Sequence, residues 1–161
     1  VELEKWLPIL QKSRIIGFDT ETKPSFKKGK INGVALLQLA TDDIALIIRV
    51  NSLGLPIALI KLLEDRKVVK VGAAIRDDIK SLQKIKPFKP EGFIDLQTFA
   101  KENGIENTSV RKLAAIVLNV RVSKSQQLSN WESDQLTEAQ LQYAATDAWI
   151  CSEIYKKMKQ G

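Results

Sequence analysis

The sequence predicts a single α/β domain, residues 1–161, built on a mixed five-stranded sheet with helices on both faces. Three observations lead to this fold class. Five short apolar runs have the composition of strands, helical spacing of apolar residues separates the later runs, and no repeat or low-complexity tract marks a second domain. The length is enough to bury roughly two thirds of the surface of the unfolded chain.

The first half of the chain is expected to form an antiparallel group of strands. A helix over residues 2–12 precedes strands at 14–20, 33–41 and 44–50. Because the turn at 41–43 is short, the second and third strands form an antiparallel hairpin. The first strand is expected to join the same group.

The second half is expected to alternate between helices and strands. In order, we expect a helix at 55–65, a strand at 67–72, a helix at 76–84, a strand at 93–95, and helices at 95–104, 109–118 and 137–159. The strand at 67–72 follows a helical crossover, which predicts that it lies parallel to the first strand. Asp95 caps one helix, which Gly104 ends.

Two capping-box patterns lie near the C-terminus. Thr137 and Gln140 have the spacing that opens a long last helix, whose lysine-rich end suits the negative pole of the helix dipole. Ser129 and Glu132 have the same spacing and predict a short turn of helix after the polar, basic loop at 121–130.

Composition excludes several kinds of chemistry. The chain has no histidine, so a histidine triad, a histidine general base and a His-ligated zinc site are excluded. Its one cysteine, Cys151, cannot form an internal disulfide, so we expect a core residue and an intracellular protein. No apolar run approaches the ~20 residues of a membrane span. The net charge of +6 favours a polyanionic partner.

Two acids follow the first strand. Asp19 and Glu21 are two residues apart, so their side chains point to the same face. Two carboxylates at such a short distance repel each other, and a divalent cation relieves the repulsion. The pattern is also compatible with a strand that ends in a solvated acidic turn.

Two further acids lie on other elements. Asp78 opens the helix after the fourth strand, and Asp147 lies on the edge of a buried stripe of the last helix. Either could serve only the structure, Asp78 as an acid at a helix N-terminus and Asp147 in a salt bridge. Gathered around one point with Asp19 and Glu21, they would select hard cations such as Mg²⁺ or Mn²⁺. Two such ions ~4 Å apart cleave phosphodiesters.

The ordered motifs resemble those of the DEDD superfamily of 3′–5′ exonucleases. These motifs are Asp-Thr-Glu-Thr after an apolar strand, Val-Gly with Asp78 six residues past the glycine, and Tyr-Ala-Ala-Thr-Asp on the last helix. The pair Tyr143 and Asp147 resembles the tyrosine subgroup, which includes ribonuclease D and the Werner syndrome exonuclease. The likeness extends over nearly the whole chain.

The resemblance implies a ribonuclease H-like fold, two Mg²⁺ or Mn²⁺ ions, and hydrolysis from a 3′ end that releases nucleoside 5′-monophosphates. It implies that Asp19 bridges both ions, that Glu21 and Asp147 hold the ion on the side of the attacking water, and that Asp78 holds the other. Tyr143 would orient the water. Since an unperturbed tyrosine has a pKa near 10, we assign Tyr143 a hydrogen-bonding role.

Residues that contact the substrate are harder to identify. By resemblance, Thr20 and Thr22 border the terminal nucleotide of single-stranded DNA or RNA with a free 3′ end. Three cationic side chains could either contact phosphates or be solvated surface charges, namely Arg76, Arg121 and Lys124. Trp131 could stack on a base or anchor the start of the last helix in the core.

Two other functions compete with an exonuclease. A scaffold of the same fold could bind nucleic acid without cleaving it, although all four acids and the tyrosine are present. Another ribonuclease H-like metallonuclease, such as an endonuclease, could use similar acids. Tyr143, four residues before Asp147, favours the exonuclease.

Overall fold

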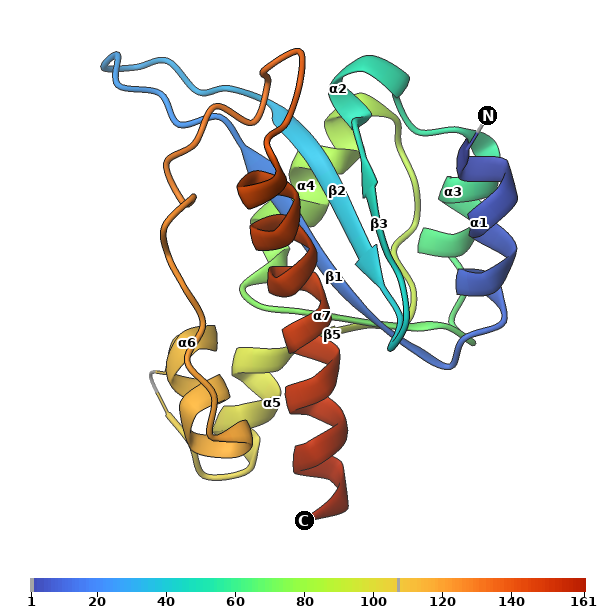
Figure 1. The fold of residues 1–161 in the computed structure, drawn as a ribbon. Coiled ribbons are helices and arrows are strands. Elements are labelled where there is room, and N and C mark those ends of the chain that lie inside the picture. The colour runs from blue at the N-terminus through green and yellow to red at the C-terminus, as the bar shows by residue number, and fades with distance from the viewer. Residues whose placement is uncertain (1, 107) are drawn as a thin grey trace.

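The computed structural model, which describes residues 2–106 and 108–161, contains a five-stranded sheet with the strand order β3-β2-β1-β4-β5 (Figure 1). The strands are β1 (Ile15–Thr22), β2 (Val34–Ala40), β3 (Ala45–Ile48), β4 (Val69–Gly72) and β5 (Phe93–Asp95). β1, β2 and β3 pair antiparallel, whereas β4 pairs parallel with both β1 and β5. The predicted mixed sheet is confirmed.

Helices cover both faces of the sheet. The helices are α1 (Glu2–Gln11), α2 (Val50–Leu53), α3 (Ile57–Leu63), α4 (Ile75–Ile85), α5 (Leu96–Glu102), α6 (Val110–Leu113), the π-helical turn η1 (Ala114–Leu118) and α7 (Glu138–Gln160). Side chains of α1, α3 and α4 share one core cluster, and those of α5, α6, η1 and α7 form another across the sheet (Figure 1). Among the described helices, none has both the length and the hydropathy to cross a membrane.

Three local details differ from the predictions. The third strand ends at Ile48, before the predicted bound at residue 50, and the short helix α2 follows it. Gly54, with a φ of 73°, ends that helix. The helix expected at 109–118 changes from α to π geometry at Ala114. No helical turn forms at Ser129, because its hydroxyl accepts a hydrogen bond from the Gln140 side chain instead of capping Glu132.

β1 presents different chemistry to the two layers. Ile16 and Phe18, both fully buried, belong to the core cluster with α1, α3 and α4. The alternate residues Gly17, Asp19 and Glu21 therefore face α7. A Cβ built on Gly17 would lie 1.8 Å from the Ala148 carbonyl oxygen, so only glycine allows α7 to approach this closely.

Asp95 joins the start of two helices. Its carboxylate accepts hydrogen bonds from the backbone N–H groups of Gln97 and Thr98, which confirms the predicted cap of α5. The same carboxylate accepts from the N–H groups of Ala74 and Ile75, where α4 begins after a residue with a φ of 50°. Asp95 thus holds the start of α4 in place at the end of β4. Asp78 lies in the first turn of that helix.

Candidate metal centre

Three acids converge where the end of β1 meets the middle of α7. Asp19, Glu21 and Asp147 each offer a carboxylate oxygen, and these oxygens all lie within 4.8 Å of one another. β1 places the first two on the face that α7 covers, and the close approach at Gly17 brings Asp147 beside them. Two segments 126 residues apart in the sequence therefore form a single cluster of oxygen donors.

Asp78 reaches the same end of β1 from the opposite side. Its Oδ1 accepts a hydrogen bond of 2.7 Å from the hydroxyl of Thr20, which lies between Asp19 and Glu21 on the strand. Asp78 raises the pKa of both neighbouring acids through its charge, so it shares their electrostatic field without belonging to the close cluster of three.

Burial and mutual repulsion shift the acids toward their neutral forms. Burial, followed by the charges of Glu21, Asp147 and Asp78, raises the pKa of Asp19 well above its ordinary value. Burial and the charges of Asp147 and Asp78 raise the pKa of Glu21 to about 8, although Arg111 opposes the shift. Burial raises the pKa of Asp147 to about 6. The described protein atoms leave this negative charge incompletely compensated.

The cluster has the chemistry of a site for a hard divalent cation. Its donors are all carboxylate oxygens, which Mg²⁺ and Mn²⁺ prefer. Oδ1 of Asp147 is buried and has no hydrogen-bond partner among the described residues, although it forms the ion pair that the sequence allowed for, with Nη2 of Arg111 at 3.7 Å. Buried charged oxygens are normally paired or bound to a metal. The single cation Arg111 leaves the pKa values of Glu21 and Asp147 raised, so a divalent cation among the three acids would relieve the repulsion that remains.

Tyr143 lies one helical turn before Asp147, at the edge of the cluster. Burial and the charge of Asp147 raise its pKa to about 12, although Arg111 opposes the shift. The phenol is therefore neutral at physiological pH and keeps its hydroxyl hydrogen. Its ring stacks on Trp131 with a centroid distance of 5.9 Å, which fixes the direction of the hydroxyl.

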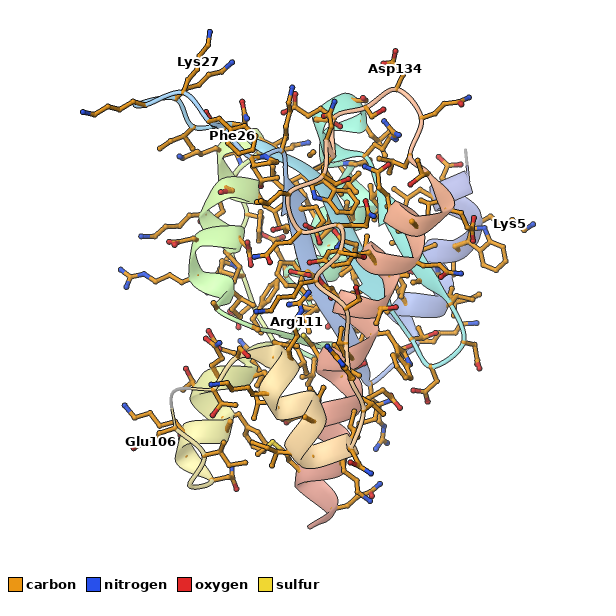
Figure 2. The ribbon with its side chains drawn as sticks, turned by 60° about the vertical axis from the view of Figure 1, so that its left-hand side comes forward. Lys5, Phe26, Lys27, Glu106, Arg111 and Asp134 are labelled. Atoms are coloured by element: carbon orange, nitrogen blue, oxygen red, sulfur yellow. The ribbon has the colours of Figure 1, made fainter. Side chains whose placement is uncertain are left out.

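Arg111 is a residue of this site that the sequence did not indicate. Its Nη2 donates a hydrogen bond of 2.8 Å to the hydroxyl of Tyr143 and lies 3.7 Å from Oδ1 of Asp147. Arg111 belongs to α6, and Figure 2 shows it at the end of this helix that faces the middle of the molecule. Sequence reasoning treated residues 109–118 only as an amphipathic helix, and no motif distinguishes this cation from its neighbour Lys112.

Trp131 is fully buried, so the prediction that it could stack on a base is wrong for this structure. It packs against Tyr143 and the β2 residues Ala35 and Leu36 in a small core cluster. The alternative reading, a core anchor near the start of the last helix, agrees with this burial. Its indole therefore acts on the site through the position of Tyr143.

The other predicted substrate residues lie around the cluster. Thr22 is exposed at the end of β1, and Arg76 is exposed in the first turn of α4. Arg121 and Lys124 are exposed on the segment that follows η1 and line one cavity there. The structure thus brings the acids and Tyr143 together and places the cations outside that cluster, on α4 and on the segment after η1.

Comparison with known proteins points to one family. Residues 1–161 match the model of a 3′–5′ exonuclease family. The mouse bifunctional 3′–5′ exonuclease/ATP-dependent helicase WRN is 34% identical over 150 residues, covering 89% of this chain and 11% of that protein. A 3′–5′ exonuclease of Arabidopsis thaliana is 33% identical over 150 residues, covering 89% of this chain and 52% of its own. The chain thus spans about half or less of these relatives.

Solved structures show the same fold. The crystal structure of the Aedes aegypti Nibbler EXO domain has a TM-score of 0.87 and 29% identity, covering 99% of this chain and 84% of that one. Escherichia coli RNase D has a TM-score of 0.83 and 22% identity, covering 98% of this chain and 43% of its own. These neighbours have the ribonuclease H-like exonuclease fold, which confirms the expected fold class.

Proposed function

Because the chain belongs to the 3′–5′ exonuclease family, we propose that it removes nucleotides one at a time from the 3′ end of a nucleic acid, with divalent cations as cofactors. The observation that carries the proposal is the cluster formed by Asp19, Glu21 and Asp147 within 4.8 Å. The family pairs this chemistry with this fold, and the acids of this chain remain in place to perform it.

Two Mg²⁺ or Mn²⁺ ions would be held by the acids, with Asp19 between them. Glu21 and Asp147 would complete one position, and Asp78 would serve the other, since it approaches from the far side of Thr20. When bound, the ions would supply Lewis-acid stabilisation of the phosphate and a lower pKa for the attacking water. The carboxylates would be ionised in that state because the cations compensate their charge.

Tyr143 would hold the attacking water by hydrogen bonding, as in the tyrosine subgroup. With a pKa of about 12 it is a poor acceptor of a whole proton at neutral pH. Its oxygen already accepts a hydrogen bond from Arg111, so its own hydrogen is directed toward Asp147 and the position of the water. In-line attack on phosphorus breaks the bond to the 3′ oxygen, which leaves a nucleoside 5′-monophosphate and a new 3′ hydroxyl.

Single-stranded DNA or RNA with a free 3′ end is the proposed substrate. One structural neighbour is a Trypanosoma brucei RNase D in complex with RNA U12, and another is Brucella melitensis NrnC bound to pGG. Thr20 and Thr22 would lie beside the terminal nucleotide, because they alternate with the acids on β1. Arg76, exposed on α4, would face its phosphates.

Digestion of an oligonucleotide labelled at its 5′ end tests the proposal. We expect a ladder that shortens stepwise from the 3′ end in Mg²⁺ or Mn²⁺ and stops in excess EDTA. Asp19→Asn should reduce turnover by about 10³-fold or more, since it removes several kcal/mol of charge stabilisation. It should not impair the fold, because it removes a repulsive buried charge.

Four results would contradict the proposal. Undiminished cleavage in EDTA would exclude the divalent cations, and undiminished cleavage by Asp19→Asn would exclude the acid cluster. Cleavage within a strand whose 3′ end is blocked would indicate an endonuclease. Binding without any cleavage by the wild-type chain would identify the scaffold instead.

A further inference from the structure

A second, oppositely charged feature lies beside the acid cluster. A cavity of about 880 Å³ separates α6 and η1 from the segment that follows them. Four of its lining residues are cationic, namely Arg111, Lys112, Arg121 and Lys124, and the others are Ser109, Ala115, Asn119, Val120, Val122 and Ser123. The described lining residues include no acid. We refer to this cavity as the basic groove.

Arg111 connects the basic groove to the acid cluster. Its Nη2 donates to the backbone carbonyl of Ser123, a residue of the groove wall, at 3.0 Å. The same nitrogen contacts the hydroxyl of Tyr143 and approaches Asp147. With a side chain only 21% exposed, Arg111 is held in place at the junction. An anion at the Arg111 end of the groove therefore lies next to the proposed reaction centre.

The charges of the groove favour a ligand with several negative charges. Lys112, Arg121 and Lys124 are exposed and have no described acid partner, whereas elsewhere on the surface Lys156 pairs with Asp42 and Glu153. Like charges along one cavity repel one another unless an anion compensates them. The volume falls in the range of pockets that accept a molecule of nucleotide size.

We propose that the basic groove binds the phosphates that precede the scissile one in a single-stranded nucleic acid. Arg111 marks the end of the groove nearest the reaction centre. Lys112, Arg121 and Lys124 contact the phosphates farther from that centre, toward the 5′ end of the strand. The inference rests on the proposed exonuclease function and adds the path of the strand. Phosphate contacts of this kind position the strand without reading its sequence.

Equilibrium binding in EDTA tests the groove independently of cleavage. Fluorescence anisotropy of a 12-nucleotide single strand, labelled at its 5′ end, is measured over a series of salt concentrations. The triple variant Lys112→Gln, Arg121→Gln and Lys124→Gln should weaken binding at least 10-fold. Each lost contact with a single strand lowers the slope of log K against log salt by about 0.7, so the slope should fall by about 2.

A matched triple variant controls for net charge. Lys12→Gln, Lys61→Gln and Lys67→Gln remove the same three charges from exposed positions at the end of α1, in α3 and before β4. This control should bind within twofold of wild type and keep its slope. If both triple variants lose affinity equally, the effect is general electrostatics and the groove is not the binding site.

Competition with a mononucleotide tests whether the groove binds a strand or another ligand. Comparing binding with cleavage tests the groove and the exonuclease proposal separately. If a nucleoside 5′-monophosphate competes as effectively as the single strand does, the groove binds product and the proposed path is wrong. If the groove variant keeps wild-type affinity and slope while the wild type cleaves, only the path is wrong. If affinity falls as expected but the wild type never cleaves, the groove stands and the exonuclease proposal fails.

Discussion

The two faces of β1 differ in what they contribute to the protein. On one face, Ile16 and Phe18 are fully buried, and Phe18 meets the ring of Phe93 edge-on at 5.1 Å. Burying side chains of this size stabilises the fold by roughly 1.5–3 kcal/mol each. On the other face, Asp19 and Glu21 lie beneath α7 with raised pKa values, which means that ionising them destabilises the folded chain.

This difference shows how a strand can hold a strained site. The apolar face supplies the stability, and alternation of side chains along the strand delivers the acids to a fixed point on the other face. The acids repel one another in the absence of a cation, and the fold holds them together despite that repulsion. Substitutions on the two faces should therefore separate stability from activity.

Removing the hydroxyl of Tyr143 should produce the largest separation. Tyr143→Phe keeps the ring on Trp131 and loses the hydrogen bond from Arg111, so we expect turnover to fall by about 10²–10⁴ with little change in melting temperature. Tyr155→Phe is the matched control, because Tyr155 lies on the same helix, is equally buried and packs on Phe99. Single-turnover digestion in Mg²⁺ measures both. If Tyr143→Phe and Tyr155→Phe lose turnover equally, the hydroxyl of Tyr143 has no specific role in cleavage.

The stability of the metal-free protein should fall as pH rises. Glu21 has its pKa raised from 4.5 to about 8 and Asp147 from 3.8 to about 6, so the folded state holds more protons than the unfolded state between these values. The stability that protonation provides is full below pH ~4 and is lost as pH rises through 6 and 8. We expect a loss of about 2–4 kcal/mol between pH 5 and 8 in EDTA, or roughly 4–16 °C in melting temperature.

Cation binding and a charge-removing variant sharpen this test. Millimolar Mg²⁺ at pH 8 should recover most of the lost melting temperature, because it binds only the folded cluster. Glu21→Gln should flatten the pH profile in EDTA, since it removes a carboxyl group whose pKa is raised to about 8. A profile in EDTA that rises from pH 5 to 8, or one that Glu21→Gln leaves unchanged, would show that the acid cluster is not strained.

The directions of the first four strands and the converging acids could be predicted from the sequence, because they follow from turn length, helical crossovers and the alternation of side chains. A short turn makes a hairpin, a helical crossover makes a parallel pair, and alternation places Asp19 and Glu21 on one face. Arg111 could not be predicted in the same way. Its contacts with Tyr143 and Asp147 depend on how α6 packs on α7, and such long-range packing leaves no local pattern.

Burial was the second quantity that the sequence left open. The local sequence of Trp131 is compatible both with an exposed side chain on a basic loop and with a buried one near the start of a helix. In the structure Trp131 is buried. Asp78 shows the reverse case, because its position in the first turn of α4 was predicted but its hydrogen bond from Thr20 depends on the side-by-side placement of β1 and β4. Sequence patterns thus located the residues, and packing determined their partners.

A pair of one-carbon changes on neighbouring residues should give the smallest but most direct contrast between the faces. Gly17→Ala places a methyl group 1.8 Å from the Ala148 carbonyl oxygen, so α7 must move away from β1 and carry Asp147 with it. We expect about 1–3 kcal/mol of lost stability and up to ~10²-fold slower cleavage, since a displacement of ~1 Å suffices for that. Ile16→Val removes one methylene on the opposite face and should lose only about 0.5–1.5 kcal/mol with cleavage unchanged. Chemical denaturation and initial rates of the two variants, measured below their unfolding transitions, decide the matter. If Ile16→Val slows cleavage as much as Gly17→Ala does, the two faces are not separable, and the geometry of the acids depends on the whole strand.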